Sequence, residues 1–296
     1  MPLFQIYLRV SIDQLERGVA ALKSLSNRVY KRAVYAALKL NASKTKALIC
    51  GFRDFVGRIP HGFPRNEVSG ILILHVDEVE KLKVIIDSKF TWKPQKEKVA
   101  KRVNRVTYSF NFFRQFTTFE LRKRLMSAFA LSHLDYCSTM YSNISGDLKE
   151  RLQRAQIKCI RYVTGLRSDA HVTPARRQLG WLTIEIRLMY FSAITIYKAR
   201  RFSQPKYLAE LFESRRRIDL GRGHAIPELT LCSTSSEAAK KSFKYECAKF
   251  WNELPNRYVT STPWEDLSLP FLNTFFRMTP YNYTERDFQS SGLSGL

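Results

Sequence analysis

Basic side chains at helical spacing are the groups in this sequence with the clearest chemistry. Six cations and one acid, Glu97, follow Trp92. The cations are Lys93, Lys96, Lys98, Lys101, Arg102 and Arg105. Ammonium and guanidinium groups neutralise phosphates, and each neutralised phosphate releases condensed counterions. We therefore expect these six residues to lie on the exposed side of one helix and to contact a nucleic-acid backbone.

Carboxylates, by contrast, are not grouped in a way that would hold a metal ion. The aspartates of the N-terminal part stand alone in the sequence: Asp13, Asp54, Asp77 and Asp87. Because Mg²⁺ needs several hard oxygen ligands close together, we predict no metal site in this chain. No GxSxG motif is present, and the histidines, His133 and His171 among them, stand apart from cysteines and carboxylate clusters.

The cysteines do not form a recognisable framework either. They are widely spaced, odd in number and contain no CxxC pair: Cys50, Cys137, Cys159, Cys232 and Cys247. This pattern disfavours both a disulfide scaffold and a zinc knuckle. We expect reduced thiols and an intracellular, nuclear location.

The charge balance supports a polyanionic partner. The 296 residues include 49 lysines and arginines against 26 acids, a formal net charge of +23. Nucleic acid is the usual partner of such an excess, and an anionic membrane is the rival. We find no run of about 18 apolar residues and no leader-like start, so we expect neither a membrane span nor a signal peptide. The triplets at 122–124 and 215–217 are candidate further contacts or localisation signals.

The predicted secondary structure changes near residue 90, from a helix and short strands to helices alone. A capping box at Ser11 and Gln14 opens a predicted helix that ends near residue 38. Three short apolar runs, at 47–50, 71–74 and 82–86, predict an antiparallel sheet. The remainder reads as helices, which we place at 93–113, 119–131, 147–164, 174–180, 184–201 and from about 237 to 251. The predicted class is therefore α+β and mostly α.

Several segments resemble one family of polymerases. The stretch Leu38-Lys39-Leu40-Asn41-Ala42-Ser43-Lys44-Thr45 resembles the "LxLNxxKT" element of non-LTR (LINE-type, jockey-like) retrotransposon reverse transcriptases. In that family the element follows a helix and enters a palm strand, which is also its predicted context here. Residues 79–92 resemble the family's primer-contacting strand before the thumb, although Lys83 stands where the family usually carries glycine.

Later segments resemble further elements of this family in the family's order. They are residues 134–137 ("LDYC"), 152–161 ("LQRxQNxxIR"), 176–182, 205–208 and 250–255 ("WNxLP"). The resemblance covers about residues 5 to 276. It implies an incomplete palm of one helix and about three antiparallel strands at 1–90, a helical thumb at 91–170, a C-terminal helical region at 171–280 and a loose tail at 281–296.

The resemblance also implies roles for single residues. In the family Lys44 lies near the incoming nucleotide, where a lysine protonates the leaving pyrophosphate or stabilises its charge; a solvated lysine is the alternative. Lys83 joins the six cations as a backbone contact. The motif positions that we expect to be structural are Asn41, Thr45, Trp92, Trp251, Asn252 and Pro255, with base stacking as the alternative for Trp92.

The family's catalytic aspartates are missing. Residues 5–7 would follow an Ala-Asp-Asp turn, but the preceding positions are Met1, Pro2 and Leu3. Intact members hold two Mg²⁺ ions on such carboxylates, so we expect this chain to bind no cofactor and to be inactive alone. The expected partners are an RNA template, a DNA primer or target DNA, and the family's missing N-terminal fingers and palm.

Two alternatives remain open from the sequence. One is an active reverse transcriptase whose gene model is truncated, which would place an in-frame Ala-Asp-Asp codon run just upstream of Met1. The other is a basic adaptor that binds protein or an anionic membrane through the amphipathic helix at 93–113.

Overall fold

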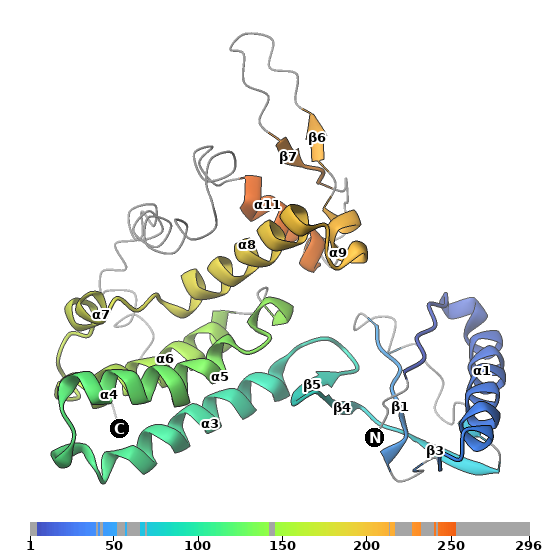
Figure 1. Ribbon diagram of the computed structural model, residues 1–296, viewed down its shortest axis with the longest axis horizontal. Coiled ribbons are helices and arrows are strands. Elements are labelled where there is room, and N and C mark those ends of the chain that lie inside the picture. The colour runs from blue at the N-terminus through green and yellow to red at the C-terminus, as the bar shows by residue number, and fades with distance from the viewer. Residues whose placement is uncertain are drawn as a thin grey trace. The chain divides into compact units, whose positions relative to one another are not determined.

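The computed structural model of the chain is α+β and mostly helical, as predicted (Figure 1). It describes residues 5–39, 41, 44–51, 57, 66–68, 70–141, 146–212, 214–216, 227–231, 240 and 242–252. The chain divides into two compact units, 1–101 and 102–296. The division falls inside α3 (Lys93–Asn111), whereas the sequence placed boundaries near residues 90 and 170. Pro255 and the predicted tail at 281–296 lie outside the described residues.

In the first unit, α1 (Leu15–Tyr35) follows a short 3-10 turn, Ile12–Gln14. The predicted capping box is not formed, because Gln14 is itself the N-cap residue and its side chain makes no capping hydrogen bond. Gly18 allows the segment before α1 to approach the helix closely, because a Cβ added at Gly18 would lie only 2.5 Å from Val10 Cγ1. The predicted apolar face of α1 is only partly covered, and Val34 is 53% exposed.

The predicted three-stranded antiparallel sheet is wrong in its pairing. β1 (Lys46–Ala47) lies parallel to β3 (Ile71–His75), and β2 (Asn66–Val68) lies antiparallel to β3 on its other side. The third predicted strand belongs to a separate hairpin of β4 (Glu78–Lys81) and β5 (Val84–Asp87). Apolar runs locate strands, but pairing depends on contacts between distant segments, which short runs do not encode.

The hairpin explains why residues 82–86 are not one strand. Lys81 pairs with Val84, which leaves Leu82 and Lys83 as a two-residue turn. Both have positive φ, 48° and 67°, as a type I′ turn requires. A left-handed conformation costs a residue with a Cβ about 1–2 kcal/mol relative to its ordinary conformations. This is the position where the resembling family usually carries glycine.

The hairpin is tied to the start of α3 by buried polar contacts. The Asp87 carboxylate accepts hydrogen bonds from the backbone N–H groups of Thr91 and Trp92, each at 2.8 Å. Gln95, in the first turn of α3, accepts one from the Ile85 N–H at 2.8 Å. Asp87 and Gln95 are both buried, so these bonds fix where the helix begins.

The second unit is built mainly from helices, most of which lie where the sequence predicts them. They are α4 (Phe119–Met126), a π-helical turn (Ser127–Leu131), α5 (Ser132–Asp135), α6 (Gly146–Thr164), α7 (Thr173–Leu179), α8 (Ile184–Phe202), α9 (Lys206–Leu211) and α11 (Phe243–Asn252). Short 3-10 turns occupy Arg114–Phe116 and Ser138–Tyr141. A small hairpin joins β6 (Ser214–Arg216) to β7 (Pro227–Leu229). The helix α9 and this hairpin were not predicted.

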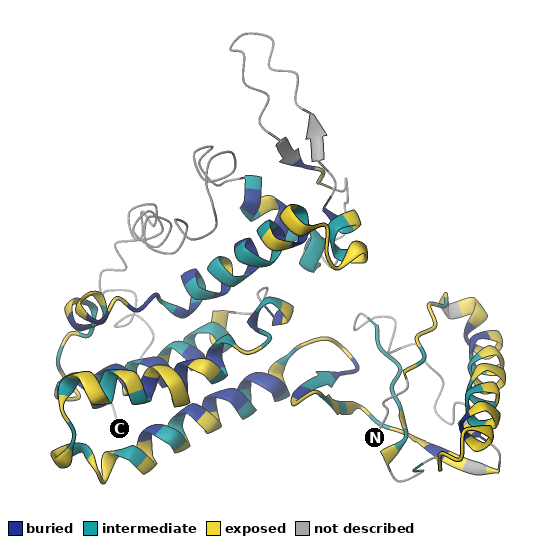
Figure 2. Ribbon diagram, in the orientation of Figure 1, coloured by how far each residue is buried: buried dark blue, intermediate teal, exposed yellow. Residues whose placement is uncertain are grey.

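Buried residues shared between helices hold this unit together. α8 and α11 share a core that includes Ile186, Ile196 and Trp251. α4 packs on α6, and α6 on α8. Buried and exposed residues alternate along these helices, as Figure 2 shows. The 3.6-residue period of the apolar positions therefore sets which face each helix buries.

The turn at Leu82 and Lys83 generates a testable prediction. Replacing Lys83 by glycine removes the Cβ that opposes the left-handed conformation, so the hairpin should gain about 1 kcal/mol. We expect amide hydrogen exchange across Glu78–Asp87 to slow about fivefold. Lys83→Ala is the matched control, because it removes the same charge but keeps the Cβ. Equal slowing in both variants would contradict the assignment.

Candidate nucleic-acid interface

The helical phase of α3 decides which of its predicted cations face solvent. Gln95, Val99, Val103 and Thr107 are buried and recur at four-residue spacing. Lys96 lies on the same face and is 0% exposed. The prediction that Lys96 contacts a phosphate backbone is therefore wrong, because its position in the helical repeat places it with the apolar residues.

Two further cations are held by the hairpin of the first unit. Lys98 donates to a Glu80 oxygen at 2.8 Å and to the Lys83 carbonyl oxygen at 3.4 Å. Lys83 itself lies 3.7 Å from Glu80 and its side chain is 79% exposed. The hydrogen bond from Lys98, followed by the charges of both lysines, lowers the pKa of the Glu80 carboxyl. Lys98 is thus part of the packing between hairpin and helix, whereas Lys83 is paired with Glu80 but remains mostly exposed.

The remaining four cations of α3 are exposed: Lys93, Lys101, Arg102 and Arg105. Among the described residues, none of these four forms an ion pair with a carboxylate. Lys101 and Arg105 are one helical turn apart and share a face. Partial burial, followed by the charge of Arg102, lowers the pKa of His133. These four cations therefore lie around the exposed surface of α3, outside its buried face.

The LxLNxxKT-like segment forms a tight turn before β1. The Asn41 side-chain oxygen accepts a hydrogen bond from the Lys44 N–H at 3.1 Å, and the Thr45 hydroxyl donates to the Asn41 carbonyl at 2.8 Å. Asn41 and Thr45 thus shape the turn, as expected for Asn41. The Lys44 side chain is exposed.

The aspartates of the first unit that the structure describes are not grouped, and Asp54 lies outside the described residues. Both oxygens of Asp87 are occupied by backbone N–H groups, and Asp13 and Asp77 are exposed. Across the part of the chain that the structure describes, no group of three or more His, Cys, Asp or Glu side chains lies close enough to hold a metal ion. Asp87 acts as a clamp on the loop that contains Trp92, whose ring lies 6.4 Å from that of Phe90.

Motif residues of the second unit converge on the start of α8. Gln153 accepts a hydrogen bond from the Ile184 N–H at 2.9 Å, and Gln156 donates to the Leu182 carbonyl at 2.8 Å. Asp135 forms a two-armed ion pair with Arg187, with Arg187 Nη2 to Asp135 Oδ2 at 2.6 Å. The sequence analysis identified these segments by resemblance but did not predict the contacts between them, because the contacts join residues more than 25 positions apart.

The WNxLP-like segment also has a packing role. Asn252 pairs with both backbone groups of Leu229: its oxygen accepts from the Leu229 N–H at 2.8 Å and its amide donates to the carbonyl at 3.0 Å. Trp251 is buried, with the Arg200 guanidinium 5.7 Å from its ring centroid. Burial lowers the pKa of Arg200. These contacts join α11 to β7 and α8.

The four described cysteines, Cys50, Cys137, Cys159 and Cys247, are free thiols, and Cys232 lies outside the described residues. Burial raises the pKa of Cys159 to about 11, and its sulfur lies 3.2 Å from the Thr107 hydroxyl. At neutral pH this thiol stays protonated, so it contributes to packing between α3 and α6 and not to nucleophilic chemistry.

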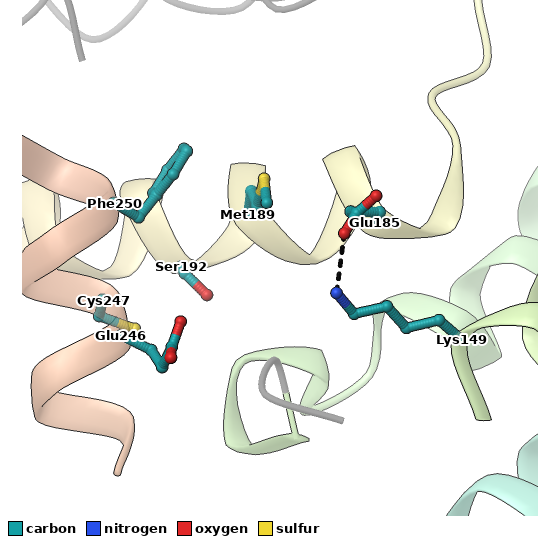
Figure 3. A pocket seen from close by; sticks show the side chains of 7 residues that line it. All are labelled: Lys149, Glu185, Met189, Ser192, Glu246, Cys247 and Phe250. Carbon is teal, nitrogen blue, oxygen red and sulfur yellow. Dashed lines mark hydrogen bonds and ion pairs between the residues drawn. The ribbon is translucent and has the colours of Figure 1, made fainter. Parts of the chain in front are cut away.

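A shallow pocket of the second unit lies between α6, α8 and α11 (Figure 3). Its lining combines the Lys149–Glu185 ion pair, at 2.8 Å, with Glu246, Ser192 and apolar side chains. Two carboxylates against one lysine make it unsuited to a phosphate. Residues 173–202, which include α7 and α8, contain an 18-residue window apolar enough to cross a membrane, but half of that window is buried, as in the core helices of many proteins. This is weak evidence of a span.

The Asp135–Arg187 pair generates a second prediction. The two side chains are 25% and 17% exposed, so removing one leaves the other charge partly buried. We expect Asp135→Ala to lower the free energy of unfolding by about 2 kcal/mol. A double-mutant cycle with Arg187→Ala should give a coupling of about 1–2 kcal/mol. The exposed helical pair Glu150–Arg154 is the matched control, for which about 0.3–0.5 kcal/mol is expected. Equal couplings would contradict the role assigned to Asp135.

Comparison with protein-family models, with curated proteins and with solved structures gives no significant match.

Proposed function

We propose that this chain binds nucleic acid through the exposed cations of α3. The observation that carries the proposal is the exposure of Lys93, Lys101, Arg102 and Arg105 on a helix that buries a different face. A formal net charge of +23 provides attraction at longer range. Phosphates are the partners that such a row neutralises, and no base-specific contact is needed.

We further propose that the chain is part of a non-LTR retrotransposon reverse transcriptase, comprising the end of the palm, the thumb and the following helical region. The support is the order of the motif-like segments along the sequence. Two local features agree with it: a positive φ at Lys83, where that family usually carries glycine, and the turn that Asn41 and Thr45 shape before a strand. On this proposal α3 is the first helix of the thumb and the template–primer backbone follows its exposed side.

Exposed apolar residues in the first unit favour a second candidate, a polymerase completed by further polypeptide. Leu72 and Leu74, two positions apart on β3, are 46% and 66% exposed, and Ile73 between them is buried. Apolar side chains exposed on one face of a strand offer an interaction site for a partner. The missing fingers and catalytic palm are the partners that the resemblance supplies.

Salt dependence tests the nucleic-acid proposal. We expect the affinity for an RNA–DNA hybrid to fall steeply with salt, and the slope of log K against log salt to lose about 2 in Arg102→Gln/Arg105→Gln, since each lost phosphate contact removes about 1. Lys158→Gln/Arg201→Gln removes two exposed cations from α6 and α8 and should leave the slope unchanged. Binding that does not depend on salt, or equal effects of the two variants, would sink the proposal.

The same proposal predicts no polymerase activity from this chain alone. With Mg²⁺, an annealed DNA primer on an RNA template should not be extended, because clustered carboxylates are needed to hold the two ions. Lys44→Ala serves as the control for co-purifying enzymes. Extension by the original chain that is lost in Lys44→Ala would contradict the prediction and would favour an active site made by residues of this chain.

A further inference from the structure

The exposed face of α3 changes from basic to aromatic toward its C-terminal end. Arg105 is followed at three positions by Tyr108, in α3, and at seven by Phe112, the residue directly after the last of α3, Asn111. These spacings place the three side chains on one side where the helical repeat continues. Tyr108 is 68% exposed and Phe112 is 66% exposed. Their ring centroids lie 5.4 Å apart. The sequence analysis missed this pair, because the rings occur among the apolar residues that mark the helix.

Two further exposed rings follow the pair in the sequence. Phe113 and Phe116, in the next turn, are 60% and 76% exposed. Four aromatic side chains at these exposures leave on the order of 400 Å² of apolar surface in contact with water. Exposed apolar surface of about this area is often functional in soluble proteins. Nothing in the packing of α3 requires these rings to be aromatic.

The geometry of the two rings suits bases that are separated from one another. The planes of Tyr108 and Phe112 are inclined by 86°, so their faces point in different directions. A duplex offers parallel stacked bases whose faces are covered, whereas a single strand can turn each base onto its own ring. From Arg105 to Phe112 the helix rises about 10 Å, close to the length of three stacked nucleotides.

We propose that the Tyr108–Phe112 pair is a stacking platform for single-stranded nucleic acid, whose phosphates lie against Arg102 and Arg105. The inference rests on the proposed nucleic-acid binding and adds the form of the ligand: an unpaired strand continuing from the backbone that the cations hold. Each stacked base contributes affinity irrespective of its identity, so little sequence preference is expected.

An anionic membrane explains the same face less well. A helix that lies in a membrane surface inserts its apolar face and keeps its cations at the flanks or on the polar side. The apolar face of α3, with Val99 and Val103, is already buried within the protein. Arg105 lies in line with the rings, so inserting Tyr108 and Phe112 into lipid would draw its guanidinium toward the apolar layer.

The test compares single-stranded oligothymidylate and oligouridylate with an RNA–DNA hybrid. In Tyr108→Ala/Phe112→Ala we expect single-strand affinity to fall about 10- to 100-fold, with its salt slope kept and hybrid affinity nearly unchanged. Phe202→Ala/Tyr207→Ala is the matched control, since these rings of α8 and α9 are 63% and 74% exposed. Tyr108→Leu/Phe112→Leu keeps apolar surface without a flat ring and should lose single-strand binding as the alanine variant does.

The outcomes separate this inference from the function it rests on. Light-induced cross-linking of a strand that carries 5-iodouracil should map to Tyr108 or Phe112. If the original chain binds both ligands with a salt-dependent affinity but the ring variants bind as tightly, the platform is overturned and the proposed function stands. If the chain binds no nucleic acid, both the stacking platform and the proposed nucleic-acid binding are contradicted. Binding to phosphatidylserine vesicles that is kept in the leucine variant and survives excess RNA would assign the face to a membrane instead.

Discussion

The second unit depends on how the start of α8 is held. Its first turn carries N–H groups that need partners outside the helix, and the preceding carbonyl of Leu182 is buried against α6. Gln153 accepts a hydrogen bond from the Ile184 N–H, and Gln156 donates one to the Leu182 carbonyl. The ion pair of Asp135 with Arg187 adds a charged anchor from α5. Because these side chains come from separate segments, α5, α6 and α8 can pack only in one register, and α11 then completes the core on α8.

α3 shows how one packing requirement limits a binding surface. Its buried face is fixed at one end by Asp87 and Gln95 and further along by Thr107, whose hydroxyl lies between Met126 and Cys159. Lys96 lies on the same side of the helical repeat as these residues and is 0% exposed. The cations available to a ligand are therefore those of α3 that remain exposed after the helix has packed. Their order, with positive charge preceding aromatic rings, gives the face a direction along the helix axis.

Helix positions could be predicted from the sequence because they depend on local periodicity. The predicted ranges for α3, α6 and α8 end within two residues of the observed ones. Strand pairing could not, since β1 meets β3 through a connection of more than 20 residues. The candidate site was half predictable: spacing placed the cations on one helix, but the burial of Lys96 depends on a single position in the helical repeat. The tie between Lys98 and Glu80 arises only once the hairpin forms.

The pairing of Asn252 with Leu229 has a consequence for how the chain behaves at high concentration. β7 has β6 on one side, so its other edge would offer backbone groups to a strand of any neighbouring molecule. At Leu229 both groups on that edge are taken by the Asn252 amide. Two positions earlier, Pro227 has no N–H to offer on the same edge. One side chain and one imino acid thus close a short edge that would otherwise invite edge-to-edge aggregation.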